Sequence, residues 1–443
     1  MTTDAFDRST WRDVAAASAA VIAVSQRVTG LWPYPTTLPE VIDYHSGSLD
    51  EAFRKPYGSY TVSWSFLLAL ERLYGEVPPH IRAAVEKWFS ENPPHNGSYG
   101  TILRDGLTKR WRMDASSRHA AYALLIRLRY APNYRPEEWW TTIQWILDHK
   151  TPDTGKGWKN RADDDDDESM STAACVGALA YFLARCGDTV RTDRRKQIHS
   201  AIRDGVAALA SSTDQGRLWS GHREGRTDVI DSALIIELLS SEHVLPQLRA
   251  SVPDFDATLD RLYRTLLGLA SEKGWPATFA TRETTLSSTI AVLLATWNRL
   301  ADSRDPVARE RLATSCEYVI EQLRSHNGGA WLLSWEWAYL GSLSVAMVRR
   351  NDGRGLTEPE RREIQEQATR MARRRYSGSR LLAAAKLPRM CYSPVAFVVT
   401  RGRLTFDANV HSLLYMMGTA FRLTTKVVRG ILYLKTYGFS RTV

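Results

Sequence analysis

Gly155-Lys156-Gly157-Trp158 is one of six similar loops that together decide the fold of this 443-residue chain. Each loop carries glycine beside an aromatic residue, and the aromatic residue recurs after 56 to 67 positions. So regular a recurrence is the sign of a repeat architecture. The six aromatic residues are Trp32, Tyr99, Trp158, Trp219, Trp275 and Trp331.

Each loop is preceded by a segment with apolar residues on one helical face and followed by a segment that is apolar all round. Such patterns predict a partly exposed outer helix and a buried inner helix. The clearest outer helices are expected at Arg194–Ser212, Asp256–Ser271 and Val307–Ser325. The inner helices are expected at Tyr60–Tyr74, Ala115–Arg129, Met170–Cys186, Val229–Leu239, Leu286–Trp297 and Trp337–Val348.

Six such helix pairs predict an all-α fold, an (α/α)6 toroid. A closed ring leaves no terminal repeat exposed, whereas a linear solenoid needs capping repeats. We therefore expect closure, with an open superhelix as the alternative. The beginnings of the inner helices are then expected to meet at the rim of a central cavity.

The positive charge of the chain is concentrated behind the repeats. Residues 358–443 hold 16 of the 58 lysines and arginines but 5 of the 49 acidic residues, a balance of +11, against −2 for residues 1–357. This predicts a toroid over 1–357 and a basic, apolar-rich C-terminal extension over 358–443, opening with a helix at Glu358–Tyr376. The extension is expected to dock on the ring, a protein partner or a membrane surface, with nucleic acid also left open.

The remaining composition points to a cytoplasmic protein, either free or peripheral to a membrane. The N-terminus lacks the basic and apolar regions of a secretory signal. No apolar run is long enough to predict a membrane span. The four cysteines are scattered and contain no CxxC pair, so neither a disulfide framework nor a zinc ribbon is expected.

Over residues 10–350 the chain resembles the terpenoid cyclase and protein prenyltransferase superfamily, through its six-fold helix pairs and Gly-x-Trp loops. Gln215-Gly216-Arg217-Leu218-Trp219 is similar to the Gln/Trp repeat of squalene–hopene-type cyclases. In those cyclases an Asp-x-Asp-Asp-Thr-Ala motif supplies the protonating acid. Asp228-Val229-Ile230-Asp231-Ser232-Ala233 matches this motif except at Ile230, so the resemblance implies Asp228 and Asp231 as catalytic acids. The Asp-x-Cys zinc pair of protein prenyltransferases does not occur in the sequence.

A second acidic candidate is the run Asp163–Glu168, which contains Asp165 and Asp166. Adjacent carboxylates repel one another, which raises some of their pKa values and suits a Brønsted acid. The same oxygens suit Mg²⁺ on a diphosphate. A solvated acidic loop ahead of a helix is the structural alternative.

Other residues are candidates for binding a substrate. Asp114 and His119 open an inner helix, where capping is the alternative role. Arg112 lies in a basic cluster that suits an anion. Tryptophan side chains can line a cavity and stabilise a carbocation through cation–π contacts. Most loop tryptophans at repeat spacing, however, are expected to be structural staples between helices. The better cavity candidates are Trp64, Trp335 and Trp337, which belong to inner helices or their beginnings.

These observations lead to three hypotheses. The first is an isoprenoid cyclase, an isomerase or lyase that protonates an apolar small molecule with a carboxylic acid in the cavity. The second is a non-catalytic toroid that serves as a protein-binding scaffold through its basic extension. The third is a carbohydrate-active (α/α)6 enzyme with paired carboxylates.

Overall fold

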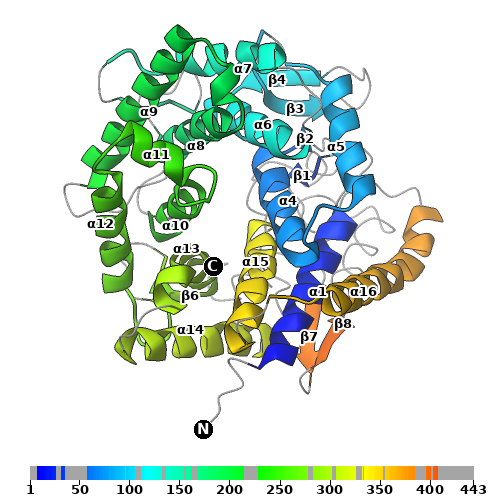
Figure 1. Ribbon diagram of the computed structural model, residues 1–443. Helices are drawn as coiled ribbons and strands as arrows, with labels where there is room; N and C mark the ends of the chain where they lie inside the picture. The colour runs from blue at the N-terminus through cyan, green and yellow to red at the C-terminus, as the bar shows by residue number, and fades with distance from the viewer. Residues whose placement is uncertain are drawn as a thin grey trace, which may run out of the picture.

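In the part of the chain that the computed structural model describes, twelve helices alternate between an outer and an inner layer of a ring (Figure 1). The outer helices are α1 (Arg8–Ser25), α5 (Pro79–Glu91), α7 (Pro136–Asp148), α9 (Thr192–Thr213), α12 (Phe255–Gly268) and α14 (Pro306–Ser325). The inner helices are α4 (Tyr60–Tyr74), α6 (Ser117–Tyr130), α8 (Ser169–Cys186), α10 (Asp228–Leu239), α13 (Leu286–Ala301) and α15 (Ser334–Asp352). The structure describes residues 7–25, 31–34, 57–94, 96–104, 111–131, 136–153, 156–160, 168–213, 228–277, 283–301, 306–325, 332, 334–352, 355–384, 396–400 and 403–407.

The inner ring is closed. Each inner helix contacts the next one along the chain, and the last, α15, contacts the first, α4. The outer helix α1 contacts both of them and so covers the joint. The predicted (α/α)6 toroid is therefore confirmed. Helix α4 begins and ends at the predicted residues, and the bounds of the other inner helices differ from the predicted bounds by a few residues.

The loop tryptophans clamp each outer helix to the inner helix that follows it. Trp158 is fully buried; its indole Nε1 donates to the Ile146 carbonyl in the last turn of α7, at 2.7 Å. Its backbone N–H donates to Thr172 Oγ1 in the first turn of α8, at 2.9 Å. Trp275 repeats both bonds between α12 and α13, and Trp32 repeats them between α1 and α4. These three tryptophans therefore have the geometry expected of structural staples.

Short strands lie at the beginnings of the inner helices, where the sequence pattern predicted none. An antiparallel sheet of order β1-β2-β3-β4 precedes α4 and α6. The expected helix start at Ala115 is wrong, because Ala115 ends strand β4 and α6 begins at Ser117, after the N-cap Ser116. The strands are β1 (Pro33–Tyr34), β2 (Tyr57–Gly58), β3 (Gly100–Arg104), β4 (Trp111–Ala115), and the pair β5 (Trp275–Pro276) and β6 (Thr284–Thr285).

The C-terminal extension begins with the expected helix, α16 (Glu358–Ala384), which packs on α1 and α4. Its first turn is held to the ring by Arg8, which binds Glu360 with two hydrogen bonds of 2.9 and 2.8 Å. Arg361 donates to the carbonyl of Arg72 at the end of α4. Beyond α16 the extension is not helical throughout, because β7 (Ala396–Thr400) and β8 (Arg403–Asp407) form an antiparallel hairpin near α1 and α14.

The ion pair between Arg8 and Glu360 predicts an acid-sensitive attachment of α16. Hydrogen bonds from Arg8 are the largest cause that lowers the pKa of Glu360, to about 2 from an ordinary 4.5. A lowered folded-state pKa adds stability above the unfolded pKa, and this stability is lost as the pH falls from about 4.5 to about 2. We expect Glu360→Gln to reduce the free energy of unfolding at neutral pH by about 2 kcal/mol.

Urea unfolding between pH 7 and pH 2 measures this difference. The gap between wild type and Glu360→Gln should close as the pH approaches 2. Glu366→Gln, at an exposed position of the same helix, is the matched control and should leave the stability unchanged. A gap that persists at pH 2 would contradict the assignment.

One described helix, α8 with the short 3-10 turn η2 (Gly187–Thr189), is long and apolar enough to cross a membrane by composition. The absence of a long apolar run, on which the sequence prediction of no membrane span rests, therefore does not hold for α8. However, 83% of its most apolar window is buried inside the toroid. Its composition is that of an inner helix enclosed by neighbours. The three cysteines within the described ranges, Cys175, Cys186 and Cys316, form no disulfide with one another.

Candidate functional site

A chamber of about 1070 Å³ lies inside the ring, at the ends of the inner helices. All six inner helices contribute to it, mostly from their C-terminal halves, so the six helices run in the same direction. The sequence pattern led us to expect a cavity mouth at the beginnings of these helices, whereas this chamber lies at the other end. Among its lining residues are Trp64, Glu71, Arg72, Arg129, Tyr181, Glu237, Leu294, Trp297, Ser342 and Arg349.

Toward the beginnings of the inner helices, the space along the ring axis narrows to an aromatic throat. The throat is formed by α4, α6, α10 and α15, and its free volume of about 10 Å³ leaves room for about one water molecule. Burial raises the pKa values of Tyr122 and Tyr339, so both stay protonated phenols. The lining residues are Trp64, Ser65, Leu68, Arg72, Tyr122, Leu234, Glu237, Leu238, Tyr339 and Ser342.

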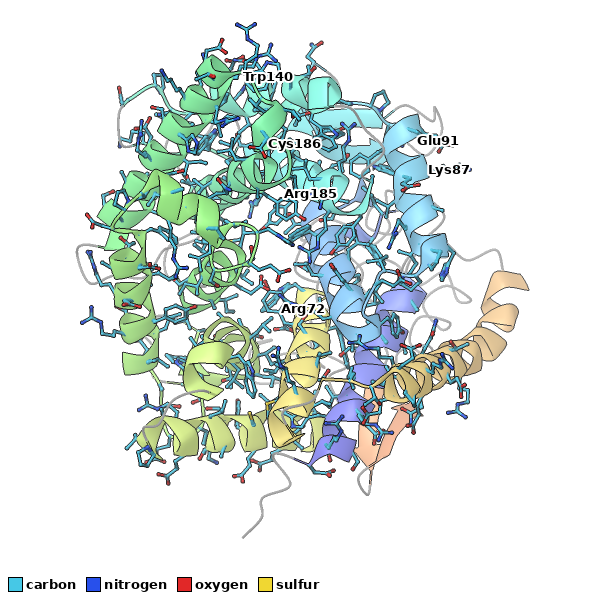
Figure 2. All side chains as sticks on the ribbon, viewed as in Figure 1. Arg72, Lys87, Glu91, Trp140, Arg185 and Cys186 are labelled. Atoms are coloured by element: carbon cyan, nitrogen blue, oxygen red, sulfur yellow. The ribbon has the colours of Figure 1, made fainter. Side chains whose placement is uncertain are left out.

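An ion pair crosses the ring between chamber and throat. Arg72 Nη2 on α4 donates to Glu237 Oε1 on α10, at 2.6 Å. Figure 2 places Arg72 in the middle of the ring. Since α4 and α10 are separated by two inner helices on either side, the pair joins opposite walls. Burial acts to lower the pKa of Arg72, but the negative charge of Glu237 outweighs it and the pKa is raised.

A second ion pair fixes the wall of the chamber. Arg129 on α6 binds Glu71 on α4 through two hydrogen bonds, of 2.7 and 2.9 Å, and the Tyr130 hydroxyl donates to the same carboxylate at 2.7 Å. Burial would raise the pKa of Glu71, yet the hydrogen bonds from Arg129 and Tyr130 outweigh it and the pKa is lowered. Glu71 is therefore a carboxylate, and a carboxylate cannot act as a proton donor.

Asp231 lies on the side of the throat that faces away from the chamber. It is half-buried in the first turn of α10, three residues before Leu234, so the two share a helical face. Its charge contributes to the raised pKa of Tyr122, after burial and the charges of other residues. Asp231 is therefore close to the throat. Asp228 is the first residue of α10, and Ile230 between them is half-buried against the core.

The predicted binding residues are distributed over several places, and only Trp64 lines the chamber and the throat. Trp337 is buried in α15, and Trp335 packs edge-on against the throat residue Tyr339, with ring centroids 5.6 Å apart. His119 is half-buried in the first turn of α6 and lies 6.3 Å from the Tyr60 ring. Asp114 and Arg112 belong to strand β4, while Asp165 and Asp166 lie outside the described residues.

The last acid of the run Asp163–Glu168 is buried, although the sequence pattern alone did not single it out from the other five. Glu168 is 4% exposed, and its Oε1 lies 3.2 Å from Arg118 Nη2. Its other oxygen accepts a hydrogen bond from Ser171. The position of Glu168, directly before α8, is the signal that could have separated it from the rest of the run. Within the described ranges, no group of three His, Cys, Asp or Glu side chains could hold a metal ion.

The polar residues of the chamber were also missed. Arg72 and Glu237 are 165 positions apart in the sequence, and Glu71 and Arg129 are 58 positions apart. Each lies near the end of a helix where charged residues ordinarily meet solvent. Packing of α4 against α6 brings Glu71 to Arg129, whereas the closed ring brings Arg72 to Glu237. No local pattern could therefore have singled out these residues.

Comparison with known proteins gives a distant likeness. No protein-family model and no curated protein matches the sequence. Among solved structures, the type II terpene cyclase MstE from Scytonema without ligand is similar at 14% identity, over 74% of this chain and 82% of that one, with a TM-score of 0.47. A single-residue variant of MstE in complex with geranylgeranyl dihydroxybenzoate is similar at 12% identity, over 77% and 98%, with a TM-score of 0.45.

Proposed function

We propose that this protein is an isoprenoid cyclase in which Asp231 is the protonating acid and the aromatic throat holds the reacting end of the substrate. One observation carries the proposal: Asp231, Leu234 and Leu238 follow one face of α10, and the two leucines line the throat. Asp231 is thus about one helical turn from the throat, on the side away from the chamber.

The chemistry of each part suits protonation of an alkene. A carboxylic acid O–H would add its proton to a carbon of the double bond, leaving a cation on the neighbouring carbon. The faces of Trp64, Tyr122 and Tyr339 would stabilise that cation. A second double bond of the same molecule would then close the ring, and loss of a proton to water would give an isomer of the substrate. The carboxylate of Glu71 is unsuited to the first step because it is already ionised.

The test is incubation of the purified chain with geranylgeranyl diphosphate, farnesyl diphosphate and squalene, with products identified by mass spectrometry. We expect a cyclised isomer from at least one substrate and a loss of at least about 100-fold in kcat for Asp231→Asn, the low end of what a positioned acid contributes. Asp256→Asn, at the exposed rim of the chamber, is the matched control. No product from any substrate, or equal rates for both variants, would refute the proposal.

A second candidate function is binding without chemistry, and the filled throat favours it. With a free volume of about 10 Å³, the throat has to widen before any isoprenoid can enter. A toroid that only binds a ligand or protein partner would not need this movement. Saturable binding of a substrate in the absence of product would support this alternative, in which the basic extension would serve as the docking element.

A further inference from the structure

The ion pair between Arg72 and Glu237 is a weak stabiliser in a position where a ligand would pass. The side chain of Arg72 is 36% exposed and that of Glu237 is 13% exposed, and both line the chamber as well as the throat. Removing two charges from water costs about as much as their attraction returns. The pair therefore adds little to the stability of the ring.

Neither partner is saturated. A guanidinium has five N–H donors, and a carboxylate accepts at both oxygens. Among the described residues, the Arg72 guanidinium makes one hydrogen bond, to one oxygen of Glu237. Most of the donors of Arg72 therefore remain available to a group in the chamber.

A second arginine lines the same chamber without an ion-pair partner in the described part of the chain. Arg349 is exposed in the last turns of α15, seven residues after Ser342, which lines the chamber and the throat. This spacing places both on one helical face. The other arginines of the lining are engaged: Arg129 is bound bidentately by Glu71, and Arg249 makes three hydrogen bonds to Asp256.

We propose that the chamber binds a phosphate or diphosphate group with Arg72 and Arg349, and that this anion replaces Glu237 as the partner of Arg72. Phosphate oxygens form strong, frequently bidentate hydrogen bonds with guanidinium groups. Since Glu237 and the ligand compete for the same cation, the carboxylate opposes binding. This inference is independent of whether the protein cyclises an isoprenoid.

The competition has a signature that a merely structural ion pair lacks. Removing the charge of Glu237 should strengthen anion binding, although it removes a native contact. Isothermal titration of the full chain with inorganic diphosphate and, separately, inorganic phosphate measures this. We expect Glu237→Gln to bind diphosphate about 10-fold more tightly than wild type, and Arg72→Gln or Arg349→Gln to bind it at least about 10-fold more weakly.

Arg249→Gln is the matched control, because Arg249 lines the chamber but is held by Asp256; it should change the affinity less than about 2-fold. If Arg72→Gln does not fold, the double variant Arg72→Gln/Glu237→Gln restores a neutral pair and should still fail to bind.

Tighter binding of phosphate than of diphosphate would limit the site to a single phosphoryl group and supports the same site. Unchanged or weaker binding in Glu237→Gln, or no binding of either anion by wild type and Glu237→Gln, would overturn the proposal. Because the readout is binding, its failure would leave the cyclase assay unaffected.

Discussion

Trp158→Ala should lower the free energy of unfolding by about 4 kcal/mol, as expected for truncation of a buried tryptophan. The indole is fully buried between three helices: it donates to the Ile146 carbonyl of α7, its backbone binds Thr172 of α8, and Gly205 of α9 lies against its ring. Alanine would leave a cavity at this junction and an unsatisfied carbonyl. Since whole domains are stable by about 5–15 kcal/mol, such a loss would be a large fraction of the total.

Two further variants separate the contributions of Trp158. Trp158→Phe keeps an aromatic ring but loses the hydrogen bond to Ile146, so we expect a smaller loss of about 1–3 kcal/mol. Trp140→Ala is the control, since Trp140 is only half-buried and lies under Arg194, 4.1 Å from its ring centroid; about 1 kcal/mol is expected there. Denaturant unfolding followed by circular dichroism gives all three values. A loss below about 1 kcal/mol for Trp158→Ala would mean that the clamp is not a main source of stability.

Gly274→Ala should lower the free energy of unfolding by about 3 kcal/mol through overpacking. A Cβ at this position would lie 2.9 Å from Thr289 Cγ2 and still closer to its Oγ1. Thr289 cannot simply turn away, because its hydroxyl donates to the Thr285 carbonyl at 2.7 Å and accepts from the Trp275 backbone at 3.1 Å. The added methyl group therefore has to break the clamp between α12 and α13.

Gly268→Ala provides the matched control at the end of the preceding helix. No atom lies within 4 Å of a Cβ built there, so alanine should be neutral or stabilise α12 by up to about 1 kcal/mol through its higher helix propensity. Thermal unfolding of both variants measures the contrast. Equal midpoints for Gly274→Ala and Gly268→Ala would show that the close approach to Thr289 can be relaxed at little cost.

The sequence predicted the helices of the ring well because each inner helix carries its own signal. The segment Tyr60–Tyr74 is mostly apolar and follows the capping residue Ser59, and it is helical over the predicted residues. The strands were missed for the opposite reason. Trp111–Ala115 contains arginine and aspartate, and it is extended because Gly100–Arg104 lies beside it. That pairing depends on tertiary structure and has no local pattern.

The candidate site was predicted less completely than the fold. Asp231 was singled out by resemblance, and its position near the throat keeps it a candidate acid. Glu237, six residues later on the same helix, carries no motif, although it faces Arg72 across the ring. Charge and spacing along the chain indicate which residues are polar. They do not indicate which polar residues will face one another across the central axis once twelve helices have closed the ring.

The contact of α1 and α4 with α15 also constrains how the chain is made and how it can be altered. During synthesis the ring cannot close until residue 352, the end of α15, has left the ribosome. Until then the faces of α1 and α4 that α15 will cover have no partner from α15. For the same reason a deletion of one helix pair would leave two edges that no longer meet. Shortening by whole repeats, which linear repeat proteins tolerate, should therefore fail here.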